Sequence, residues 1–191
     1  MTKNFPVHSV IEGCRRGQQS SQLMLYEHFF GYAMGVCLRY SKNREEALEI
    51  TNDGFFKAFT KIDQFDSKQP FKPWLRRILI NVSIDYYRKY HRLNEAHGLE
   101  NIKMAPTAIY NEALDNLEFN DLLKITQRLP AAYRMVFNLY VIENYTHQEI
   151  ADQLEISVGT SKSNLSKARQ KIKSMLGVSH GIYLKPETNG G

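Results

Sequence analysis

The segment from Thr146 to Lys173 carries residue types that suit contact with duplex DNA. Five basic residues and no acidic residue fall between Ser157 and Lys173, so this stretch has a net charge of +5. Small residues at its start would bring a helix end close to the floor of a groove, where hydroxyl, amide and cationic groups reach bases and phosphates. The predicted contacts are Ser157, Gly159, Thr160, Lys162, Ser163, Asn164, Lys167 and Arg169.

The sequence also encodes the elements that would present these residues. Thr146 followed by Glu149 has the pattern of a capping box, which begins a short helix. Ser157 can cap a longer basic helix that runs to about residue 176, and the small Ala151 lets the two helices cross closely. Two helices joined by a tight turn predict a helix-turn-helix. A lysine-rich helix that is only solvated is the alternative, and it would not require the cap, the turn and the small residues together.

A second basic stretch, residues 67–92, combines cations with aromatic side chains. Its seven basic residues and one acidic residue give a net charge of +6. Aromatic faces beside cations suit unstacked bases and single-stranded backbone, and stacking contributes about 1–3 kcal/mol per base. Trp74, at helical spacing, is expected to serve mainly the core. The predicted single-strand contacts are Phe65, Lys68, Phe71, Lys72, Arg76, Arg77 and Arg88.

A third stretch, residues 43–66, is acidic, with six acidic and three basic residues and a net charge of −3. Asn43 with Glu46 three positions later predicts the start of a helix. Glu49, Asn52 and Asp53 on that helix could meet a basic partner helix, and a solvated acidic face is the alternative. Gly54 indicates either a bend or close packing.

Apolar periodicity predicts helices over residues 23–38, 43–62, 74–92, 112–129, 131–143 and 158–176, and no stretch alternates as a strand does. Residues 65–73, with two prolines, are expected to form an ordered loop. Residues 93–111 lose helical periodicity. Together with the residues that follow them, up to 127, they hold six acidic and two basic residues, a net charge of −4. The fold class is therefore predicted as all-α, with two small helical domains, 1–92 and 112–176, joined by a flexible linker, 93–111, and followed by a flexible tail, 177–191.

Several classes of protein are excluded by composition and motif. No apolar run approaches the roughly 20 residues of a membrane span, and residues 1–16 are too polar for a secretory signal. Cys14 and Cys37 lack metal-ligand spacing and are predicted to be free thiols in a reducing, cytoplasmic setting. There is no Gly-rich phosphate loop, no His-Glu-x-x-His and no hydrolytic triad pattern, so we expect no enzymatic activity, no metal and no cofactor.

Taken together, these stretches resemble a known family: bacterial RNA polymerase sigma factors of the extracytoplasmic-function (ECF) branch, which retain the second and fourth conserved regions. The resemblance covers about residues 20–92 and 112–176. The motifs that carry it are Asn52–Phe59, Trp74–Asn81 followed by Asp85 and Arg88, Leu129–Arg134, Glu149–Ala151 and Ser157–Ser163. One departure is Glu155, which stands in the helix-turn-helix turn where the family usually has Gly. A non-Gly residue in the left-handed conformation costs roughly 1–2 kcal/mol, so a slightly strained turn is expected.

The resemblance implies a promoter-specificity subunit of RNA polymerase. Glu49, Asn52, Asp53 and Phe56 would dock on the clamp of the largest subunit, and the second domain would also meet the flap of the second-largest subunit. The loop over 64–73 would capture an extruded base of the minus-ten element, with Asn81 helping to line its pocket. The helix from Val158 would read the minus-thirty-five element. The family further implies an anti-sigma factor as a candidate partner.

Two other functions are consistent with parts of the sequence. A stand-alone helix-turn-helix regulator would act as a dimer on a palindromic site. The sequence offers no evident dimerisation helix, and the aromatic and basic stretch over 65–92 would then have no purpose. A nucleic-acid enzyme is the third class, and the missing catalytic grouping argues against it.

Overall fold

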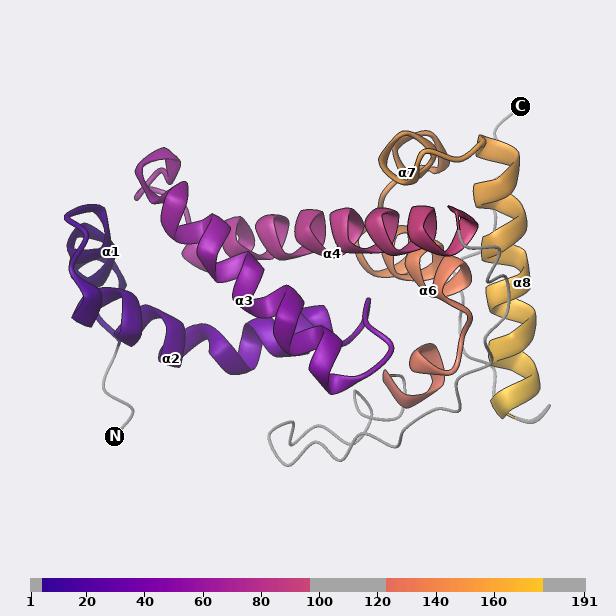
Figure 1. The fold of residues 1–191 in the computed structure, drawn as a ribbon, viewed down its shortest axis with the longest axis horizontal. Helices are drawn as coiled ribbons and strands as arrows, with labels where there is room; N and C mark the ends of the chain where they lie inside the picture. Colours follow the sequence, from indigo (N-terminus) through magenta and orange to yellow (C-terminus); the bar gives the residue numbers. More distant parts are fainter. Residues whose placement is uncertain (1–4, 97–122, 177–191) are drawn as a thin grey trace. The chain divides into compact units, whose positions relative to one another are not determined.

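The computed structural model describes residues 5–96 and 123–176. Within these ranges every regular element is helical, which confirms the all-α prediction (Figure 1). The chain divides into two compact units, Met1–Asp115 and Asn116–Gly191. The predicted linker covers 93–111, but residues 93–96 continue the helix that starts at Phe71, so the helix ends later than predicted. The rest of the linker, the tail over 177–191 and the predicted helical positions 112–122 lie outside the described residues.

Four α-helices and one short turn of 3₁₀-helix form the described part of the first unit: α1 (Val7–Arg15), α2 (Gln19–Cys37), α3 (Arg44–Thr60), η1 (Ile62–Gln64) and α4 (Phe71–Ala96). In Figure 1, α3 runs between α2 and α4, and it packs against both. Helix α1 was not predicted from the sequence, although its Val10, Ile11 and Cys14 are buried. Helix α4 begins three residues before the predicted start because Pro73 sits in its first turn, where a missing N–H removes no helical hydrogen bond.

The start of α3 confirms the predicted cap. The Asn43 Oδ1 accepts a hydrogen bond of 2.9 Å from the Glu46 amide. The Glu46 carboxylate reaches back to the Lys42 amide at 2.5 Å, one residue earlier than in a standard capping box. The end of α3 is two residues earlier than predicted, because the chain tightens into η1 after Thr60.

Gly54 marks close packing between α3 and α4, one of the two outcomes that the sequence allowed. A Cβ at this position would lie 2.5 Å from Cδ2 of Leu79, which is itself fully buried. The missing side chain therefore lets the two helices approach. Phe55, next to Gly54, is 2% exposed and belongs to the same core.

The described part of the second unit contains a helical segment over 123–127, followed by α6 (Ala131–Phe137), the π-helical turn η2 (Asn138–Ile142), α7 (His147–Leu154) and α8 (Val158–Leu176). Pro130 precedes α6, as predicted, and the predicted helix over 131–143 is α6 with its π-helical continuation. The capping box at the start of α7 is confirmed. Hydrogen bonds from Thr146 hold the pKa of the Glu149 carboxyl below its usual value, so the box is present across the neutral range.

Cys14 and Cys37 are free, as predicted, and the structure shows that both are also buried. Burial raises the pKa of the Cys37 thiol to about 12, which keeps it in the unreactive protonated form. None of the helices in the described ranges is long and apolar enough to cross a membrane.

Candidate nucleic-acid interface

Helices α7 and α8 form the predicted helix-turn-helix. Ser161, in the first turns of α8, is fully buried, and its Oγ lies 2.9 Å from Nδ1 of His147 at the start of α7. The His147 ring also stacks on Tyr140 of η2, with ring centroids 4.5 Å apart. Leu165 and Ala168 bury the inner face of α8. These contacts fix α8 against the rest of its unit. The α8 residues between the buried ones, such as Lys162, Ser163 and Lys167, therefore face the solvent.

The turn between α7 and α8 has the predicted strain. Glu155 adopts the left-handed conformation, with φ of 57° and ψ of 43°. The turn is closed by a hydrogen bond of 3.0 Å from the Ile156 amide to the Ala151 carbonyl. Because Glu155 has a Cβ, this conformation costs roughly 1–2 kcal/mol relative to a right-handed one. The turn forms nevertheless, so the presence of α8 does not depend on a glycine here.

Most residues predicted to contact duplex DNA lie on the outer face of α8. The exposed members are Ser157, Gly159, Thr160, Lys162, Ser163 and Lys167. Ser157 is also the cap, because its Oγ accepts a hydrogen bond of 2.9 Å from the Thr160 amide. Asn164 and Arg169 are half-buried. The Arg169 guanidinium lies 6.0 Å from the centre of the Tyr140 ring, which favours packing within the unit over contact with a groove.

Helix α4 presents an exposed stripe at every fourth residue. Its members share one helix face because four residues make slightly more than one turn: Pro73, Arg77, Asn81, Asp85 and Lys89. Asn81 is at the centre of this stripe. The acidic member, Asp85, is paired with Lys57 of α3 at 2.9 Å, so its charge is partly neutralised. Arg76 and Arg88, also predicted to contact a single strand, are half-buried beside the stripe.

The loop before α4 is anchored by aromatic rings rather than presenting them. Phe65 and Phe71, predicted to contact single-stranded DNA, are only 3% and 4% exposed. The Phe65 ring packs edge-on against Phe71 at 5.4 Å and lies 5.2 Å from Trp74. Both rings hold the loop against the core, and both also line the pocket beside the loop. Lys68 and Lys72 are exposed, as predicted.

A pocket of about 520 Å³ opens beside this loop, and sequence reasoning did not find it. Gln69, Pro70 and Lys72 line one part of it, and Phe5 and His28 line another. The Phe5 and His28 rings are stacked, with centroids 3.6 Å apart. These two residues are 23 positions apart in the sequence and carry no shared motif, so only the tertiary fold brings them together.

Helix α3 exposes two adjacent rows of side chains with spacing of four. One row is acidic, with Glu45, Glu49 and Asp53, and the other carries Leu48, Asn52 and Phe56. Phe56 is 69% exposed and Leu48 is 40% exposed. Tyr26 donates a hydrogen bond of 3.0 Å to Asn52, and Tyr86 donates one of 3.3 Å to Glu49, so neighbouring helices orient both polar side chains. The arrangement suits a partner that is basic and partly apolar.

Comparison with known proteins finds two matching family models, one in each unit. Residues 25–93 match the family model described as Sigma-70 region 2, and residues 119–172 match the model described as Sigma-70, region 4. The ECF RNA polymerase sigma factor SigW of Bacillus subtilis is 30% identical over 176 residues, covering 87% of this chain and 94% of that protein. The ECF RNA polymerase sigma-E factor of Haemophilus influenzae is 22% identical over 186 residues, covering 92% and 98%.

A solved structure shares the fold. The sigma factor RpoE of Bartonella quintana, in complex with the anti-sigma factor NepR, matches with a TM-score of 0.51 and 22% sequence identity. The match covers 81% of this chain and 96% of that one. The all-helical, two-unit architecture is thus that of a solved sigma factor.

Proposed function

The chain belongs to the sigma-70 family of RNA polymerase sigma factors, in its ECF branch, and from this premise we propose how its two units divide promoter recognition. The protein is an initiation factor that binds core RNA polymerase and directs it to specific promoters. We propose that the first unit binds the polymerase and the opened minus-ten element, and that the second reads the duplex minus-thirty-five element. The supporting observation is that each family region falls on a unit with an exposed face of matching chemistry.

Helix α3 is the proposed docking surface for the clamp of the polymerase's largest subunit. Glu49 and Asp53 supply negative charge. Phe56, in the adjacent row, supplies an exposed apolar anchor. Aromatic anchors of this kind dominate the energy of many interfaces, and charge complementarity sets their specificity. A polymerase flap contact by the second unit is a further proposal that rests on the family alone.

The loop over 65–70 and the exposed stripe of α4 form the proposed single-strand site. The pocket beside the loop has a volume in the range of small-ligand pockets. Lys72 lines it, and Lys68 is exposed in the same loop, so both can meet backbone phosphates. Asn81 is not among the residues that line this pocket, but on the exposed stripe its side-chain amide can donate to and accept from a base edge. We propose that an extruded base is held here while the strand stays open.

Replacing Asn81 with Ala is expected to slow promoter opening by about tenfold while leaving duplex binding unchanged. The substitution removes hydrogen bonds worth roughly 1–1.5 kcal/mol, and it does so only in the open complex. Permanganate reactivity of minus-ten thymines, followed over time with reconstituted holoenzyme, measures opening. Gln19→Ala, an exposed amide on α2, is the control. An equal loss of opening and of duplex binding would contradict the role given to Asn81.

Helix α8 is the proposed reader of the minus-thirty-five duplex. Its outer face offers the capped N-terminus, hydroxyls and exposed lysines that suit phosphates and base edges in a major groove. Lys167 extends this face, with its Nζ 6.0 Å from the centre of the Tyr133 ring.

Replacing Lys162 with Ala should weaken holoenzyme binding to the upstream duplex and lower its salt dependence. One lost phosphate contact reduces the slope of log K against log salt by about one. Titration of a labelled upstream duplex at four or more salt concentrations gives this slope. Lys173→Ala, an exposed lysine near the other end of α8, is the matched control. An unchanged slope in Lys162→Ala would show that this lysine does not meet a phosphate.

A dimeric stand-alone regulator is not favoured, because both sigma regions are present in one chain. We propose that the protein acts in the cytoplasm, where bacterial RNA polymerase works, and that an anti-sigma factor restrains it. These two proposals rest on the family.

A further inference from the structure

Helix α1 lies outside the segment that matches region 2, which begins at residue 25. It is nevertheless built into the first unit, since it packs against α2 and against η1, the turn that leads into the loop over 65–70. A helix outside the matched region that touches the approach to the single-strand site has a route to influence that site.

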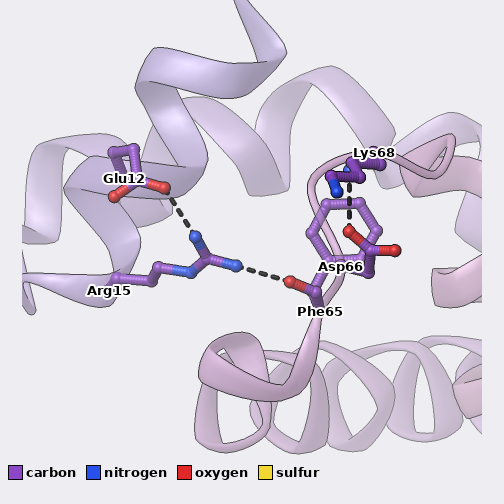
Figure 2. Close-up of polar contacts among 5 residues, drawn as sticks. All are labelled: Glu12, Arg15, Phe65, Asp66 and Lys68. Carbon is purple, nitrogen blue, oxygen red and sulfur yellow. Dashed lines mark hydrogen bonds and ion pairs between the residues drawn. The ribbon is translucent and has the colours of Figure 1, made fainter.

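The contact itself is made by Arg15, the last residue of α1. Its Nη1 is paired with the Glu12 carboxylate at 2.6 Å, and its Nη2 donates a hydrogen bond of 2.5 Å to the Phe65 carbonyl (Figure 2). Figure 2 shows the guanidinium between the two partners, with one end on α1 and the other on the first residue of the loop. A charged donor to a carbonyl makes a stronger bond than a neutral one.

The rest of the loop is fixed from inside. The Asp66 Oδ1 accepts a hydrogen bond of 2.9 Å from the Lys68 amide, and the Asp66 carbonyl accepts one of 2.9 Å from the Gln69 amide. These bonds join residues within the loop, so they set its shape but do not attach it to the rest of the unit. The Arg15 hydrogen bond and the buried Phe65 ring attach the loop to the packed helices of the unit. The direction in which Lys68 and the pocket wall face therefore depends on where the Phe65 carbonyl is held.

We propose that Arg15, oriented by Glu12, is a positioning residue for the single-strand site: it holds the loop over 65–70 in the geometry that receives the unpaired base. The inference rests on the proposed function of this loop. Arg15 has no contact with the strand in this scheme, so it acts on opening through the loop alone. Because the bond is to a backbone carbonyl, a lysine ammonium can replace part of it, whereas an apolar side chain of similar length, which has no donor, cannot.

The experiment compares holoenzymes reconstituted with the full chain carrying Arg15→Met, Arg15→Lys or Arg16→Met. Methionine keeps an apolar stem but removes the donors, and Arg16 is the adjacent, exposed control. We expect Arg15→Met to slow permanganate-detected opening by about tenfold and to weaken binding of a single-stranded minus-ten oligonucleotide by a similar factor. Arg15→Lys should recover most of both, and all variants should bind the upstream duplex as the unaltered chain does.

Three results would overturn the inference: opening by Arg15→Met at the unaltered rate, no recovery with lysine, or an equal loss of upstream duplex binding. Should Arg15→Met fail to fold by circular dichroism, Glu12→Gln replaces it, because Glu12 is exposed and its loss leaves the carbonyl bond without an oriented donor. Glu12→Gln should slow opening by about threefold, and an unaltered rate overturns the inference. If the unaltered holoenzyme opens no selected promoter, the proposed function itself fails, which is a different outcome.

Discussion

Replacing Phe56 with Ala is expected to weaken binding to core RNA polymerase by about 30-fold, without changing the stability of the chain. The ring is 69% exposed in the free protein, so its removal costs the folded state little. In a complex it would be a buried aromatic anchor, and truncating such an anchor costs about 2 kcal/mol or more. Anisotropy of a fluorescently labelled chain titrated with core polymerase gives the dissociation constant directly.

The matched control for Phe56 is Met24→Ala. Met24 is an exposed apolar side chain as well, 46% accessible, but it belongs to α2. We expect it to leave the affinity for core polymerase within about twofold. Equal effects of the two substitutions would mean that α3 is not the docking surface, and no effect of either would place the polymerase contact elsewhere on the chain.

Replacing Arg134 with Met is expected to destabilise the second unit by about 2–3 kcal/mol, because it removes a buried charged donor that bonds two backbone carbonyls. Arg134 is 4% exposed. Its Nη1 donates hydrogen bonds of 3.2 Å to the carbonyl of Gln127, the last residue of the preceding helical segment, and of 3.3 Å to the carbonyl of Leu129, in the turn after it. Its own carbonyl accepts a bond of 3.0 Å from the buried Asn138 amide.

Urea unfolding followed by circular dichroism measures this effect, and hydrogen exchange with mass spectrometry assigns it to one unit. We expect exchange protection to fall in α6, α7 and α8 while α2, α3 and α4 stay protected. The chain should then keep its affinity for core polymerase and lose upstream duplex binding. Arg128→Met, an exposed arginine six positions earlier, is the control. A change of less than about 1 kcal/mol in Arg134→Met would show that the buried bonds are replaceable.

The features that the sequence predicted well depend on residues close together in the chain. The caps at Asn43, Thr146 and Ser157 satisfy amides three residues away, so a short pattern is enough to place them. The left-handed conformation of Glu155 is expected from the family resemblance, because the family usually has Gly at this position of the turn. Exposure of the outer face of α8 follows from helical periodicity.

The features that were missed depend on tertiary contacts. Arg134 is charged and would be placed at the surface by composition, yet it is buried and donates to the carbonyls of Gln127 and Leu129. The cations around Phe65 and Phe71 predict contact with DNA, but Phe29 of α2 packs on Phe71 and Trp74 packs on Phe65. Arg15 donates to the Phe65 carbonyl, 50 positions further along the chain, and no local sequence pattern predicts that contact.

Permanganate footprinting of a selected promoter tests the central claim most directly. The promoter would be enriched from a random library by binding to core polymerase carrying this chain. Minus-ten thymines should become reactive only when chain and core polymerase are both present, and the upstream duplex should be protected in the same complex. Failure to open any enriched promoter, or opening and protection by core polymerase without the chain, would contradict the division of labour between the two units.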